Sequence, residues 1–179
     1  MNETRAFEHF PTPIVLLCNT VPVLIYLSGI AITLKVSWIA ALIYFLFILA
    51  SEYRLLSRSC TRCYYYGKNC GFGKGRVSSW FFKRKEPMDI FSADMTWKDL
   101  IPDILISLIP LVTGIILMIV EFNILILLAV IIIVVMSSAG NGYIRSNFAC
   151  KFCRQRIVGC PAQKFFGTDR VKEENEENL

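Results

Sequence analysis

Charge is scarce in this sequence. Only 18% of its 179 residues are Asp, Glu, Lys or Arg, whereas an ordinary soluble domain carries about 25%. Hydrophobic residues make up 55% of the chain. So little charge excludes a freely soluble globular domain. It also excludes a disordered chain or a nucleic-acid-binding tail, since both need many more polar residues.

Histidine and deeply placed carboxylates are scarce as well. His9 is the only histidine, so catalytic triads and histidine-based zinc catalysis have little to build on. The acidic residues near the apolar runs all fall at the borders of those runs: Glu52, Asp99, Asp103 and Glu121. The sequence therefore offers no obvious proton relay or ion pathway.

Apolar runs of membrane-spanning length are the main feature that is present. A spanning helix needs about 20 mainly apolar residues, and four segments approach or reach this length: residues 14–34, 36–52, 101–120 and 122–138. Pro22 and Pro110 fall inside the first and third runs and can kink them. The sequence predicts an all-α integral membrane protein with four transmembrane helices.

The distribution of Lys and Arg predicts the orientation. Of the 19 basic residues, one precedes the first span, one separates spans one and two, ten lie in the central loop, none lies between spans three and four, and seven follow span four. Basic residues stay on the cytoplasmic side. We therefore expect a multi-pass protein of the cell membrane with both termini cytoplasmic. This topology and contact with anionic lipid explain the net charge of +5, so no nucleic-acid partner is expected.

The cysteines reveal an internal repeat. Cys60, Cys63 and Cys70 follow the spacing C-x2-C-x6-C, and Cys150, Cys153 and Cys160 repeat it 90 residues later. Tyr53 and Tyr143 also stand 90 residues apart, as do Lys74 and Lys164. Each triplet follows a two-span hairpin, and a unit with two spans returns to its starting side. The two copies are therefore expected to be parallel repeats, each ending in a cytoplasmic cysteine loop.

This repeat sets the predicted boundaries. Repeat 1 covers residues 1–76, an interfacial linker covers 77–100, repeat 2 covers 101–170, and an acidic disordered tail covers 171–179. The linker places Trp80, Phe81 and Phe82 beside Lys83, Arg84 and Lys85, a composition suited to the plane of the lipid headgroups.

Six cysteines facing a reducing cytoplasm favour metal binding over structural disulfides. The x2 spacing lets two thiolates of one turn face a soft cation, so the predicted metal ligands are Cys60, Cys63, Cys70, Cys150, Cys153 and Cys160. Nearby cations would offset the negative charge of such a cluster: Arg62, Lys68, Lys151, Arg154 and Arg156. Cys18 lies inside the first span and is expected to be a small apolar side chain.

Ligand counting leaves several arrangements open. Two zinc ions need eight bonds, which six thiolates supply if two of them bridge. Alternatively, the two C-x2-C pairs make one four-thiolate zinc site and leave Cys70 and Cys160 as a free pair. An iron–sulfur cluster is a third arrangement, and thiol–disulfide redox chemistry at Cys70 and Cys160 is a fourth possibility.

The cysteine spacing resembles each half of the fungal binuclear zinc cluster. In that family the first cysteine of each half bridges both ions, which would correspond to Cys60 and Cys150. The resemblance covers about 22 residues, and the linker here has 79 residues and contains a membrane hairpin. It therefore implies a metal geometry and not DNA binding.

A second resemblance concerns the whole chain. The segments YYYGKNC at residues 64–70 and GCPA at residues 159–162 are similar to motifs of small prokaryotic four-helix membrane proteins with twin cysteine loops. This resemblance implies no activity. We expect a non-enzymatic membrane protein with a zinc site joining its two halves, in a structural or metal-sensing role. Besides the bilayer, its possible partners are a cytoplasmic protein or a second copy of the chain. The alternative is a membrane thiol oxidoreductase or an iron–sulfur electron carrier.

Overall fold

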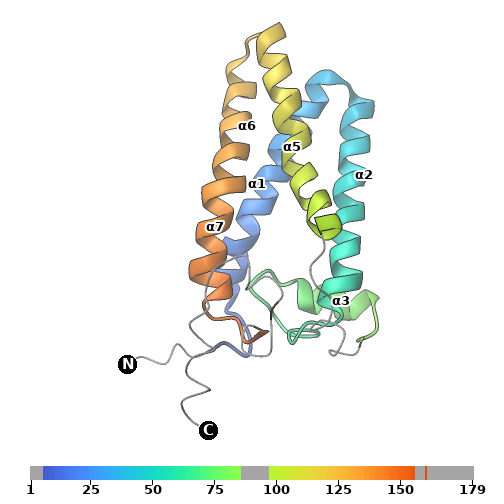
Figure 1. Ribbon diagram of the computed structural model, residues 1–179, viewed down its shortest axis with the longest axis vertical. Coiled ribbons are helices and arrows are strands. Elements are labelled where there is room, and N and C mark those ends of the chain that lie inside the picture. The colour runs from blue at the N-terminus through green and yellow to red at the C-terminus, as the bar shows by residue number, and fades with distance from the viewer. Residues whose placement is uncertain (1–5, 86–96, 156–159, 161–179) are drawn as a thin grey trace.

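The computed structural model describes residues 6–85, 97–155 and 160, and the helices dominate this part of the chain (Figure 1). The long helices are α1 (Thr12–Val36), α2 (Trp38–Leu55), α5 (Trp97–Val120) and α6 (Ile124–Val135). The shorter ones are α3 (Lys74–Phe81) and α7 (Asn141–Ile144), with π-helical turns at Leu56–Cys60, Met136–Gly140 and Arg145–Cys150. The tail 171–179 and the linker residues 86–96 lie outside the described residues.

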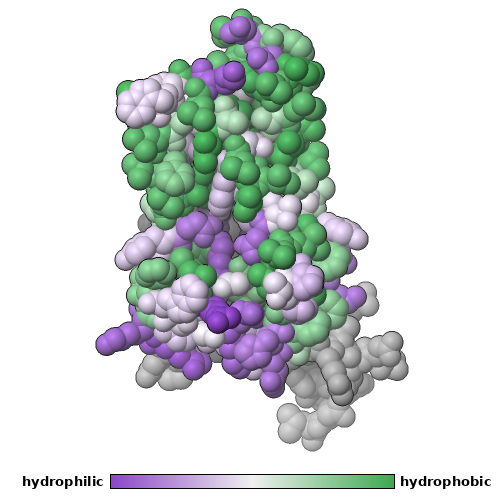
Figure 2. All heavy atoms as spheres, turned by 180° about the vertical axis from the view of Figure 1, so that it is seen from behind, coloured by the Kyte–Doolittle hydropathy of each residue, from purple (hydrophilic) through white to green (hydrophobic). Residues whose placement is uncertain are grey.

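Four helices are long and apolar enough to cross a membrane, as the sequence predicts. These spans are Thr12–Val36, Trp38–Cys60, Ile101–Val120 and Ile124–Cys150. Large apolar side chains cover most of their outer surface, and Figure 2 shows them as a broad hydrophobic band above a more hydrophilic end. Such an apolar surface would aggregate in water but is stable against lipid, which is consistent with a multi-pass membrane protein.

Local capping sets where the second and fourth helices begin. The Ser37 side chain accepts a hydrogen bond from the Ile39 backbone N–H (3.2 Å), and Asn123 accepts one from Leu125 N–H (2.9 Å). These caps satisfy backbone donors that the helix itself leaves unpaired. Accordingly α2 begins at Trp38 and α6 at Ile124, each two residues later than the apolar pattern predicts.

Helix α1 is the centre of the bundle. It packs against α2, α5 and α6, and α5 packs in turn against α6. Its buried residues recur at helical spacing: Cys18, Val21, Ile25, Ser28, Gly29, Ile32 and Thr33. Small side chains at such an interface let helix backbones approach closely. Gly29 is one case, because a Cβ added there would lie only 2.7 Å from Cε1 of Tyr44.

Tyr44 joins three helices and satisfies a backbone carbonyl that one of them leaves unpaired. Pro110 has no backbone N–H, so it leaves the carbonyl of Ile106 in α5 without its usual helical donor. The buried Tyr44 hydroxyl, from α2, donates a hydrogen bond to that carbonyl at 2.7 Å. In an apolar bundle each backbone polar group needs a partner, and Tyr44 supplies this one across the helix interface.

Candidate functional site

Two cysteine loops and an N-terminal segment meet at one end of the bundle. We call this region the cap, comprising residues 6–11, 56–85 and 145–155 together with Cys160. The first loop follows α2 and the second follows α6 and α7, and both lie at the same end of the helices (Figure 1). The structure therefore brings both cysteine triplets to one side.

The two loops begin with the same local geometry. Cys60 and Cys150 are each the last residue of a π-helical turn. The backbone N–H of Cys63 donates to the Cys60 carbonyl (3.4 Å), and that of Cys153 donates to the Cys150 carbonyl (3.2 Å). π-helical turns are rare and are frequent at functional sites. Because one such turn ends at the first cysteine of each C-x2-C pair, the backbone enters both pairs with the same geometry.

The sulfur atoms of Cys63 and Cys153 share one kind of hydrogen bond. The backbone N–H of Tyr65 donates to the Cys63 sulfur, and the backbone N–H of Gln155 donates to the Cys153 sulfur. In each case the donor lies two residues after the cysteine. A backbone N–H directed at sulfur stabilises a thiolate relative to a thiol. This equivalence was not foreseen from the sequence, which fixes only the spacing of the cysteines.

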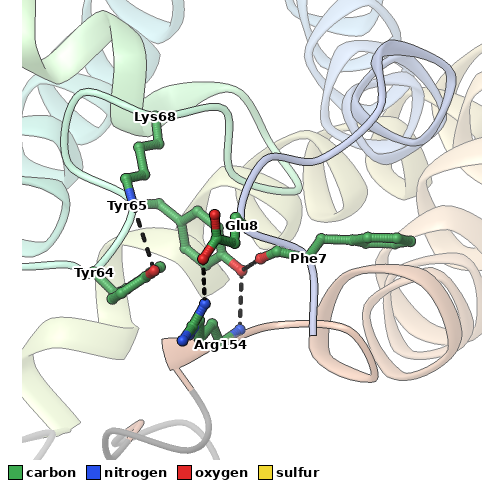
Figure 3. Close-up of polar contacts among 6 residues, drawn as sticks. All are labelled: Phe7, Glu8, Tyr64, Tyr65, Lys68 and Arg154. Atoms are coloured by element: carbon green, nitrogen blue, oxygen red, sulfur yellow. Dashed lines mark hydrogen bonds and ion pairs between the residues drawn. The ribbon is translucent and has the colours of Figure 1, made fainter. Parts of the chain in front are cut away.

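Tyr65 is the central side chain of the cap. Only 1% of its surface is exposed. Its hydroxyl donates to the Phe7 carbonyl at 2.5 Å and accepts from the backbone N–H of Arg154 at 2.9 Å (Figure 3). One phenol therefore holds the first loop, the second loop and the N-terminal segment together. Sequence reasoning missed this residue because it stands among three consecutive tyrosines.

The N-terminal segment runs between the loops. The Phe7 backbone N–H donates to the Phe152 carbonyl (3.0 Å), and the Phe10 N–H donates to the Asn69 carbonyl (2.9 Å). The Phe7 ring lies 5.0 Å from that of Phe152, and the Phe10 ring lies 5.5 Å from that of Tyr65. This segment thus ties both loops by backbone bonds and by aromatic contacts.

The loops also touch each other directly. Gln155 is buried, and its side-chain oxygen accepts a hydrogen bond from the Tyr64 backbone N–H at 2.6 Å. A Cβ added at Gly71 would lie 3.1 Å from the Cβ of Ala149. The absence of a side chain at Gly71 therefore permits this close approach.

The cysteine thiols interact electrostatically across the two loops. The pKa of the Cys153 thiol is raised to about 12, chiefly by burial; the Gln155 N–H opposes this rise, and nearby Cys63, Cys160 and Cys150 add to it. Burial likewise raises the pKa of Cys63, the Tyr65 N–H lowers it, and Cys70 and Cys160 raise it again. The hydrogen bond from the Tyr64 N–H to Gln155 independently places the segments that follow Cys63 and Cys153 in contact.

The described residues do not, however, assemble a finished coordination sphere. Among them, no three His, Cys, Asp or Glu side chains are placed so that they could hold a metal ion. All seven cysteines are free thiols, and the six in the loops are half-buried. Cys18 is fully buried in α1, as expected for a packing residue. The predicted six-thiolate site therefore stays a prediction.

Of the cations expected to balance a thiolate cluster, Lys68 and Lys151 lie over aromatic rings and Arg154 pairs with a carboxylate. Lys68 Nζ lies 4.6 Å from the centre of the Tyr64 ring, and Lys151 Nζ lies 5.7 Å from that of Phe152. Arg154 pairs with Glu8 at 2.6 Å (Figure 3). Arg156 falls outside the described residues. These contacts place positive charge on the cap next to the cysteine loops.

A polar network joins the cap to the bundle. Glu52 of α2 pairs with Lys74 at the start of α3, at 2.7 Å, and accepts a hydrogen bond from the Tyr26 hydroxyl of α1 at 2.6 Å. The sequence places Glu52 at the membrane border but does not show its partners. The network anchors α3 to the last turns of the second span.

Comparison with protein-family models, curated proteins and solved structures finds no match to this chain. The two family resemblances noted from the sequence accordingly remain predictions.

Proposed function

We propose that this protein is a non-enzymatic membrane protein whose two cysteine loops jointly bind a soft metal cation, zinc in the first instance. The bound cation would clamp the two halves of the cap, which then acts as a docking surface or as a metal sensor. The observation that carries this proposal is that two loops with identical cysteine spacing and equivalent backbone geometry contact each other at one end of the bundle.

The proposal includes the internal symmetry of the chain. We take the hairpin α1–α2 and the hairpin α5–α6, each with its cysteine loop, as parallel repeats. Supporting this are the matching π-helical turns before Cys60 and Cys150 and the exposed Tyr53 and Tyr143 at equivalent positions. The basic residues gathered in the segments that form the cap support a cytoplasmic cap in the cell membrane.

Metal binding would change the chemistry of the loops. Each ligating thiol must lose its proton, so binding releases protons and the folding of the cap becomes coupled to the metal. Backbone donors already directed at the sulfurs of Cys63 and Cys153 would favour the thiolate form. A structural zinc site is closed by four ligands, which the two C-x2-C pairs supply without any residue from outside the loops.

Elemental analysis of the purified full-length protein, with a visible spectrum, tests the proposal. We expect zinc in stoichiometric amount, a colourless sample, and loss of the zinc in a Cys153→Ser variant. A Cys18→Ala variant is the matched control and should retain the metal. A brown, iron-containing sample would indicate that the loops bind an iron–sulfur cluster and not zinc. Metal-free protein with a reversible Cys70–Cys160 disulfide would overturn the proposal in favour of a thiol oxidoreductase.

A further inference from the structure

Helix α3 buries small side chains and exposes large aromatic ones, the reverse of a helix that packs on a water-soluble domain. Its buried residues are Gly75 and Ser78, whereas Trp80 and Phe81 are 68% and 72% exposed. A helix on a water-facing domain turns its apolar face inward. Here the small residues face inward because Gly75 lies against the Tyr65 carbonyl and because Ser78 donates a hydrogen bond to the Leu56 carbonyl (3.0 Å).

The position of α3 explains this inversion. It packs on the π-helical turn Leu56–Cys60, which ends the second span, and it lies at the foot of α2 in Figure 1. The Phe82 ring, one residue after α3, contacts the ring of Tyr53 on the outer surface of α2, with centroids 5.3 Å apart. The exposed rings of α3 are therefore held at the level where the apolar span meets the cap.

Positive charge surrounds these rings. Arg76 lies one helical turn before Trp80, and Lys83, Arg84 and Lys85 follow directly after Phe82; all four basic side chains are exposed. None of them forms an ion pair with any of the described residues. Residues 74–85 include no Asp or Glu, and Lys74 itself is already paired with Glu52. Within the described part of the chain, the face therefore combines aromatic rings with cations that have no ion-pair partner.

We propose that this face, formed by Arg76, Trp80, Phe81 and residues 83–85, binds the anionic headgroups of phospholipids in the leaflet on the cap side. Aromatic side chains favour the boundary between headgroups and acyl chains. Basic residues next to them attract anionic lipids, and each contributes at the membrane surface. Charge complementarity and the height of α3 beside the span select the lipid phosphate over a soluble partner.

Quenching of Trp80 fluorescence by brominated lipid tests this binding directly. Trp38 and Trp97 are first replaced by Phe, so that Trp80 is the only tryptophan, and circular dichroism confirms the fold. The protein is placed in nanodiscs containing phosphatidylcholine and phosphatidylglycerol, with one lipid brominated at a time and at equal mole fraction. We expect brominated phosphatidylglycerol to quench Trp80 about threefold more strongly than brominated phosphatidylcholine.

Two lysine pairs separate specific binding from the effect of overall charge. The K83Q/K85Q variant should lose the preference for phosphatidylglycerol, whereas K68Q/K151Q, which removes two lysines elsewhere in the cap, should keep it. Equal quenching by both lipids in the parent protein would overturn the proposal. An unchanged preference in K83Q/K85Q would do the same. Quenching by neither lipid would indicate that water, a second copy or another protein covers this face, and would also overturn it.

Discussion

Tyr65 is the residue on which the cap depends most. It is buried at the meeting point of three segments that are remote in sequence, and its hydroxyl is bonded to two of them. A buried hydroxyl with both a donor and an acceptor partner fixes the positions of the backbones around it. Protein contacts therefore hold the cysteine loops together without the help of a bound cation.

A Tyr65→Phe substitution tests this role. It removes both hydrogen bonds and leaves the Phe7 carbonyl and the Arg154 N–H without this partner, which should lower the free energy of unfolding of the cap by about 1–3 kcal/mol. Faster maleimide labelling of Cys63 and Cys153 would report the loosening. Tyr143→Phe is the control, since its exposed hydroxyl makes no hydrogen bond to a described residue. Equal labelling rates in the two variants would contradict the role of Tyr65.

Gly75 gives a second test at the level of single residues. A Cβ there would overlap the Tyr65 carbonyl and lie 2.9 Å from the Lys68 carbonyl. Because both obstacles are backbone atoms, Gly75→Ala should destabilise the cap by about 1–3 kcal/mol.

Gly142→Ala is the matched control for Gly75→Ala. Its added methyl meets nothing within 4 Å, and replacing a helical glycine with alanine should stabilise the protein by up to about 1 kcal/mol. Thermal unfolding of both variants in the same detergent checks the pair. A lower melting temperature for Gly142→Ala than for Gly75→Ala would contradict the packing described for α3.

At the level of helices, apolar run length was enough to predict four spans, because few other sequences place so many apolar residues without charge. It was not enough to predict the central position of α1, since helices that are apolar all round carry no signal for which face packs inward. The extension of spans two and four to Cys60 and Cys150 was also missed. These extensions interrupt the apolar runs with polar and charged residues, and the helical backbone continues through π-helical turns.

The junction of Tyr44 with Pro110 supplies the prediction at this level. Tyr44→Phe should destabilise the bundle by about 1 kcal/mol, because the Ile106 carbonyl loses the hydrogen bond from the Tyr44 hydroxyl. Adding Pro110→Ala should restore most of this loss, since the new backbone N–H can bond to Ile106 within the helix. Unfolding in mixed detergent micelles measures both variants. The same loss in Tyr44→Phe/Pro110→Ala as in Tyr44→Phe would contradict this account of the junction.

For the whole molecule, the cysteine repeat predicted which segments would meet but not what holds them together. Parity of the spans is sufficient to place both loops on one side, whatever the packing of the helices. The contacts through Phe7, Tyr65 and Gln155 depend on the tertiary arrangement of single residues. Neither spacing nor composition contains that information, so these aromatic contacts and hydrogen bonds could be found only in the structure.

The central claim is that the two loops bind one cation together. The metal content of variants that lack one cysteine triplet tests this claim most directly. One variant replaces Cys60, Cys63 and Cys70 with Ser, and the other replaces Cys150, Cys153 and Cys160. If both loops supply ligands to a shared site, either variant should lose all of its zinc, since two or three thiolates from one loop cannot close a four-coordinate site. Retention of half the zinc in each variant would show two independent sites and contradict the claim, and so would an unchanged metal content.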